Sequence, residues 1–431
     1  DTVSLASGAS QSGFGRAGSV DWQTGSLKTS TFTAASGEGY FINQSSAITA
    51  NLPAGSAGAI VAFSDYARNF ATYNLTVSPN GSEKIGGNAG DVILNVNGQA
   101  ATFVYVDGTK GWVNVQNAED TEIGIPPFIA ATGGTVTECG NFKVHTFTGP
   151  GTFATTTIAP GPSGNPNVAD YLVVAGGGSG GKATSSGGGG GAGGMRFSAT
   201  TYCSPSPLKA PAGLTLTAST SYPITVGGGG TTQPSSATGP NGSNSVFSTI
   251  TSTGGGGGGG GPESSQPPRN GQAGGSGGGS TYGPGGTAPN TTVGPGNNPP
   301  VSPSQGNDGG KGAPQSGTHA GGGGGGFTAA GVNGANPQTS CQGAGGAGLA
   351  ISITGSPVAY AGGGGGGIQT GSPDNAGPGG TGGGGGGGKD AGGVSNGTAG
   401  TANTGGGGGG SGPGNGAAGG SGIVVIRYKF Q

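Results

Sequence analysis

The 431-residue sequence has little charge, few cysteines and no long apolar run. Charged residues make up 7% where about 25% is usual, and 14 basic against 16 acidic residues leave a net charge of −2. A chain this neutral, with no basic run, lacks the electrostatic footprint of a nucleic-acid-binding protein. No stretch approaches the roughly 18 apolar residues of a membrane span, so we expect no membrane insertion. The three cysteines form no CxxC motif and therefore indicate neither a disulfide framework nor a zinc site.

Residues suited to catalysis are equally scarce. The two histidines are His145, in a strand-like run, and His319, just before a glycine tract, and no HxxxH, GxSxG or carboxylate constellation accompanies them. Residues 176–182 satisfy the GxxxxGK pattern of a P-loop, but Ala183 stands where a P-loop needs Ser or Thr, and the following residues cannot begin a helix. We therefore expect no enzyme activity, no cofactor and no metal site. His145 is expected to be a sheet residue and His319 a loop residue that contacts a ligand.

Glycine, in contrast, supplies 113 residues, about a quarter of the chain against a usual 7%. Its distribution is uneven, with 21 glycines in residues 1–150 and 92 in residues 151–431. The composition therefore indicates two differently built parts that meet near residue 150. The longest uninterrupted tracts are six to eight residues long, at 254–261, 321–326, 362–367, 382–388 and 405–410.

The first part reads as a β module. Short β-branched or aromatic runs at 39–42, 59–63, 92–96 and 102–106 are separated by turn clusters such as Pro79-Asn80-Gly81, which predicts antiparallel strands with tight turns. Residues 1–37, rich in Ser, Thr, Gly and Ala, are expected to form an extended segment that orders against neighbouring chains. No window has helical periodicity, so we expect an all-β protein with essentially no α-helix.

The second part alternates strands with glycine. Expected strands, each rich in Val, Ile, Thr, Tyr or Phe, are residues 143–147, 171–175, 195–199, 221–226, 245–251, 349–354, 358–361 and 423–430. Most of them run directly into or out of a glycine tract.

Flexible linkers are the usual interpretation of glycine-rich sequence. Here the tracts cluster in length, apolar strands flank them, and the charge of disordered chains is missing, so we favour ordered helices of the polyproline-II type. Such helices have no internal hydrogen bonds, and one surrounded on all sides has room only for glycine. Mixed segments such as 274–280 and 343–348 then suit outer helices that expose Ser or Ala.

The predicted fold is a β-sandwich-like layer that carries a bundle of polyglycine II helices, with polar loops at the far end of the bundle. We divide the chain into residues 1–37, a β module at 38–125 and a glycine-rich domain at 126–431. Loops on a rigid scaffold are where binding usually resides. The loop side chains best able to hold a ligand are Gln266, Arg269, Tyr282, His319, Gln369, Asp374 and Lys389.

Several of these segments resemble tail-fibre and receptor-binding proteins of marine bacteriophages. Residues 37–42 through 100–112 look like a recurrent phage-fibre β module, and residues 129–153, 171–178 and 421–428 look like the glycine-rich terminal module of such fibres. The glycine-rich domain of the anaplastic lymphoma kinase receptor family looks like a more distant analogue. The resemblance implies a virion tail-fibre component, commonly a homotrimer, that contacts other tail proteins and touches the host at its distal end. Aromatic residues are scarce in the loops, which departs from adhesins that stack sugars.

We therefore expect a structural fibre protein and adhesin whose loops bind a host surface glycan or outer-membrane protein. The alternative is a self-assembling filament or decoration protein without receptor specificity. An enzyme that degrades surface glycan is the weakest hypothesis, because no acid–base pair is visible.

Overall fold

The computed structural model describes residues 20–116, 128–158, 167–184, 186–198, 209–210, 212–261, 270–281, 292–315, 318–334, 343–369, 376–389 and 395–430. The chain divides into two compact units, one of residues 1–129 with 157–167 and one of residues 130–156 with 168–431. We call them the N-terminal unit and the glycine-rich unit. In the described parts every regular element is a β-strand, which confirms the all-β prediction.

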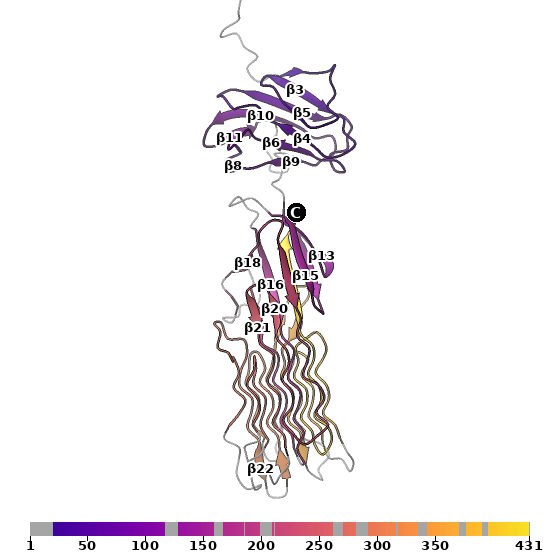
Figure 1. The fold of residues 1–431 in the computed structure, drawn as a ribbon, viewed down its shortest axis with the longest axis vertical. Helices are drawn as coiled ribbons and strands as arrows, with labels where there is room; N and C mark the ends of the chain where they lie inside the picture. The colour runs from indigo at the N-terminus through magenta and orange to yellow at the C-terminus, as the bar shows by residue number, and fades with distance from the viewer. Residues whose placement is uncertain are drawn as a thin grey trace, which may run out of the picture. The chain divides into compact units, whose positions relative to one another are not determined.

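Two facing sheets build the N-terminal unit (Figure 1). The larger has the order β1 (Asp21–Trp22), β3 (Glu38–Ile42), β5 (Ile60–Asp65), β10 (Ala100–Asp107), β11 (Gly111–Asn114), β7 (Lys84–Ile85) and β8 (Asn88–Ala89). The smaller has the order β2 (Phe32–Thr33), β4 (Ile48–Asn51), β6 (Leu75–Ser78) and β9 (Val92–Leu94). Alternate residues of both sheets, including Phe63, Phe103, Leu75 and Val77, fill one buried core.

The strand directions in this unit are antiparallel only in part: β10 runs antiparallel to β5 and β11, and β9 to β6, as we expected, but other pairs are parallel. β3 runs parallel to β1 and β5, and β4 runs parallel to β2 and β6. The reason is that the chain passes back and forth between the two sheets, so successive strands of one sheet need not form a hairpin. Residues 20–37, expected as an extended segment, contribute β1 and β2 to these sheets.

Two further sheets form one end of the glycine-rich unit. One has the order β12 (Ala130–Thr132), β15 (Gly151–Thr157), β19 (Ser221–Thr225), β20 (Ser245–Phe247) and β21 (Ile250–Ser252). The other has the order β13 (Thr135–Cys139), β14 (Phe142–Phe147), β27 (Ile423–Lys429), β16 (Val168–Val174) and β17 (Met195–Phe197), with β18 (Leu214–Thr215) paired to β16. The Phe153 ring lies between the sheets, with ring centroids of His145, Tyr428 and Phe247 5.1–6.1 Å away.

One expected strand of this layer is a hairpin. Residues 245–251 contain two strands, β20 and β21, which pair with each other around a turn at Ser248. Ser248 has φ of 53°, a left-handed conformation that ends a strand. The β24 (Leu349–Ile351) and β25 (Val358–Tyr360) hairpin lies elsewhere in the unit and contributes Ile351 and Tyr360 to a second apolar cluster.

Glycine tracts extend side by side from the sheets as a bundle (Figure 1). Tract 187–194 shows how they pack. Its N–H groups donate in turn to tracts 405–411, 253–259 and 322–325, over 2.8–2.9 Å, and each neighbour is reached again every third residue. Its carbonyl groups accept in the same cycle from tracts 175–181, 276–279 and 364–367, over 2.8–3.1 Å. A threefold extended helix with six neighbours therefore satisfies nearly all of its backbone groups through the bundle.

This packing leaves no room for side chains. A Cβ built on any glycine of residues 187–193 would lie 2.0–2.2 Å from a neighbouring backbone atom. Ala192 is the exception within this tract and lies in the second apolar cluster, beside the sheets. The tract 274–280, expected on the outside, is interior, since Ser276 and Ser280 are fully buried. Serine is thus small enough for some interior positions as well as for the surface.

Candidate binding surface at the end of the bundle

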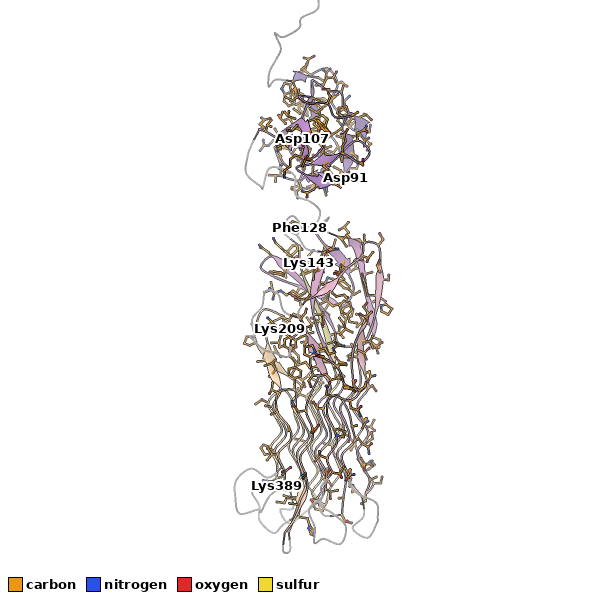
Figure 2. All side chains as sticks on the ribbon, turned by 90° about the vertical axis from the view of Figure 1, so that its left-hand side faces the viewer. Asp91, Asp107, Phe128, Lys143, Lys209 and Lys389 are labelled. Atoms are coloured by element: carbon orange, nitrogen blue, oxygen red, sulfur yellow. The ribbon has the colours of Figure 1, made fainter. Side chains whose placement is uncertain are left out.

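The end of the bundle opposite the two sheets gathers segments that are far apart in the sequence. We call this end the tip and define it by residues 182–184, 231–237, β22 (Ala313–Gln315), β23 (Thr318–Ala320), β26 (Ile368–Gln369), Lys389, 395–396 and Asn415. Figure 2 shows Lys389 at this end and Lys143 and Lys209 toward the other. The tracts fix where each of these segments begins, because the last glycines remain hydrogen-bonded to their neighbours.

A small sheet at the tip brings together three of the residues that the sequence analysis selected. β23 pairs with β22 and with β26, so that the backbone of His319 lies opposite Gln369. Ile368 then forms a bridge with Lys389, whose N–H donates to Ser395 Oγ over 3.2 Å. His319 is half-buried and Lys389 is exposed. His319, Gln369 and Lys389 therefore lie on three adjacent chain segments.

The other four selected residues are not placed. Gln266, Arg269, Tyr282 and Asp374 lie outside the described residues, as do Cys203 and Cys341. Their loops begin and end at described tract ends, and Gly261, the last described residue before Gln266 and Arg269, forms a bridge with Ala183 at the tip.

The P-loop-like segment serves the scaffold. The N–H groups of Gly178 and Gly181 donate to tract 187–194, so they are not available to cradle a phosphate. The Lys182 ammonium donates to the Pro234 carbonyl and to Asn415 Oδ1, each over 2.9 Å. Lys182 therefore ties two tip segments together.

His145 is a sheet residue, as predicted. It lies fully buried in β14, where Nδ1–H donates to the Gly133 carbonyl over 2.7 Å and Nε2 accepts from the Tyr428 hydroxyl over 3.0 Å. Burial lowers the pKa of His145 and raises the pKa of Tyr428 to about 12. Both side chains are thus neutral at pH 7 and hold the sandwich together.

The sequence analysis missed a set of side chains on the flank of the bundle. Asn244 Oδ1 accepts from Gly254 N–H over 2.9 Å, and Asn241 Oδ1 accepts from Gly257 N–H over 2.8 Å. Each amide supplies the acceptor that a further glycine helix would supply in the interior. The three-residue spacing of the two asparagines matches the helix repeat, and this spacing is the signal that could have identified them.

The described tip offers hydroxyl, amide, ammonium and imidazole groups. Within the described residues, no cluster of three or more His, Cys, Asp or Glu side chains could hold a metal ion. Nor does any helix there have the length and apolarity to cross a membrane. The hydroxyl, amide, ammonium and imidazole groups at the tip can donate or accept hydrogen bonds.

A sequence model of a glycine-rich domain matches residues 146–429, well over half of the chain. The chain belongs to this glycine-rich domain family. No curated protein sequence matched it. The matched range starts in β14 and ends in β27, which pair with each other in the middle of one sheet. The glycine-rich domain therefore begins and ends within one pair of strands and places all of its tracts between them.

Proposed function

We propose that this chain is a phage tail-fibre protein that attaches to a host surface receptor through the tip of its glycine-rich domain. The observation that supports the proposal is that different groups of this domain build its scaffold and form its exposed end. Backbone hydrogen bonds hold the bundle, whereas His319, Gln369 and Lys389 stand on adjacent segments at its end. The phage assignment itself comes from the sequence resemblance stated above.

A rigid scaffold favours binding because the loops lose less freedom when they meet a ligand. The tract ends restrict each loop at both of its anchors, and Lys182 joins two tip segments. Hydroxyl, amide and cationic groups suit the hydroxyl and carbonyl groups of a surface glycan or an exposed protein loop. The role that we propose is binding, without catalysis.

The test compares tip variants with a matched variant elsewhere in the unit. Purified chain is incubated with outer-membrane fractions from a panel of marine bacteria, and bound protein is quantified. The double variant H319A/K389A should bind at least about tenfold less, which corresponds to 1.4 kcal/mol. K209A removes an exposed lysine away from the tip and should bind like the parent chain.

Equal binding by all three proteins would contradict a role for the tip. Electron microscopy of the same samples separates the alternative function, because a filament protein would form long polymers without any bacterial fraction. Discrete particles whose binding depends on His319 and Lys389 would support the receptor-binding proposal.

A further inference from the structure

The N-terminal unit carries a row of partly exposed aromatic rings on its larger sheet. Trp22 of β1 and Phe41 of β3 have ring centroids 4.9 Å apart and planes tilted by 32°. Tyr66, which follows β5, lies 6.4 Å from Phe41 in an edge arrangement. Trp22 is 36% exposed and Tyr66 is 58% exposed, while Phe41 between them is half-buried. We call these three residues the aromatic row.

The backbone holds the first ring in place. A Cβ on Gly39 would lie 2.7–2.8 Å from two atoms of the Trp22 indole, so the ring lies directly over this glycine. Gly39 pairs with Trp22 across the β1–β3 ladder and with Ala62 on the other side. The indole is therefore held against the sheet with part of its surface open to solvent.

The exposed residues that lie close to the row in the sequence are mostly small and neutral. The connection between β1 and β2 exposes Thr24, Ser26 and Thr29, and the segment after β3 exposes Asn43 and Ser45. Hydroxyl and amide groups beside apolar rings match the two chemistries of a neutral sugar, whose hydroxyls form hydrogen bonds and whose C–H faces pack on aromatic rings.

The exposed area of the three rings can be compared with the area that a sugar or a second protein chain would cover. Aromatic side chains bury about 150–250 Å² each, so the exposed fractions of these three rings amount to on the order of 250 Å². A stable protein interface needs about 800 Å² from each partner. The row by itself supplies less than a third of such an area, whereas its size suits a few sugar rings.

We propose that the aromatic row is a binding site for a neutral polysaccharide, which stacks its pyranose rings on Trp22 and its neighbours. This site is independent of the tip and does not rest on the proposed function of the glycine-rich domain. Neutral hexopyranose chains fit the row better than anionic ones, because the exposed polar residues named beside it are uncharged.

Tryptophan fluorescence of the intact chain tests this directly. The chain has two tryptophans, Trp22 in the row and Trp112, which is fully buried and donates to Glu83 Oε2 over 3.2 Å. Addition of β-1,4-glucan, β-1,3-glucan or α-mannan hexasaccharides at millimolar concentration should shift the Trp22 emission and protect it from a soluble quencher. The same sugars should leave the Trp112 emission unchanged in the W22F variant.

Variants assign the effect to the row. W22A and Y66A should each weaken binding about tenfold by calorimetry. G39A keeps Trp22 but displaces its ring, so it should also weaken binding. Y73A removes an aromatic ring of similar exposure outside the row and should bind normally. The Trp112 emission reports whether each variant folds.

Two results would overturn the proposal. One is that none of the three hexasaccharides protects Trp22 in a folded chain. The other is that Trp22 emission depends on protein concentration without sugar and that W22A lowers the mass measured by sedimentation, which would make the row a contact between copies of this chain.

Discussion

A single methyl group in the middle of the bundle should destabilise the glycine-rich unit while the N-terminal unit stays intact. In Gly190→Ala the new Cβ would lie 2.1 Å from the Gly178 carbonyl oxygen, whereas real Cβ atoms essentially never approach other heavy atoms closer than 3.0 Å. Tract 175–181 would have to move by about 0.9 Å, and backbone surrounds it. Overpacking costs about 1–3 kcal/mol, and one or two strained buried hydrogen bonds add about 1–3 kcal/mol. The expected loss is about 2–6 kcal/mol.

Calorimetry of the full chain measures this loss, with Trp112 fluorescence as a separate record of the N-terminal unit. The transition of the glycine-rich unit should fall by about 5–20 °C, since 1 kcal/mol shifts a large domain by about 2–4 °C. The matched control is Gly228→Ala, because that glycine is exposed and its Cβ would meet nothing within 4 Å. If Gly190→Ala melts at the same temperature as Gly228→Ala, the tightly packed bundle is wrong.

Three further predictions concern the flank, the sandwich and its buried histidine. Asn244→Ala should cost about 0.5–1.5 kcal/mol and speed hydrogen exchange at Gly254, which loses its acceptor; unchanged exchange at this amide would refute the role of Asn244. Ile426→Ala, in the central strand β27, should cost about 2–5 kcal/mol by calorimetry, whereas Val136→Ala on an exposed edge should cost less than about 0.5. Because the folded pKa of His145 is lowered, its stabilising effect is complete above about pH 6.5 and is lost as the pH falls toward the folded value. Denaturant titrations should show this pH dependence, at most about 1.4 kcal/mol per pH unit, and H145Q should lack it.

The strands of the glycine-rich unit could be predicted because their local composition is unambiguous. Residues 423–430 and 171–175 are rich in β-branched and aromatic residues and correspond to β27 and β16. The strand directions of the N-terminal unit could not all be predicted. Turn residues between two runs do not show whether the chain returns to the same sheet or crosses to the other. The left-handed turn at Ser248 could not be predicted either, because serine, unlike glycine, has no marked preference for a positive φ.

The tip could be predicted only in part. The tract lengths indicate that polar segments leave the bundle at its end, and they place His319 and Lys389 there. The pairing of β22 with β23 and β26 has no local signal, since residues 313–320 contain Pro314 and no alternating apolar pattern. That small sheet forms because the bundle brings the ends of three tracts to strand-pairing distance.

The energetics of glycine explain why the sheets and the bundle belong to one unit. Ordering a backbone costs about 1–2 kcal/mol per residue, and glycine loses the most freedom, while one internal hydrogen bond contributes about 0.5–1.5 kcal/mol. A bundle without side chains is therefore close to neutral in stability. The sandwich supplies the missing part through buried residues such as Phe153, Phe247 and Tyr428, and the apolar cluster around Ala192 and Phe327 joins it to the bundle. Since cohesion within the bundle comes from backbone groups, most side chains beyond the tract ends contribute little to its stability, and Lys182, which joins two tip segments, is an exception. Sequence changes in the tip loops can then alter the groups that the tip displays while the position of the tip stays fixed.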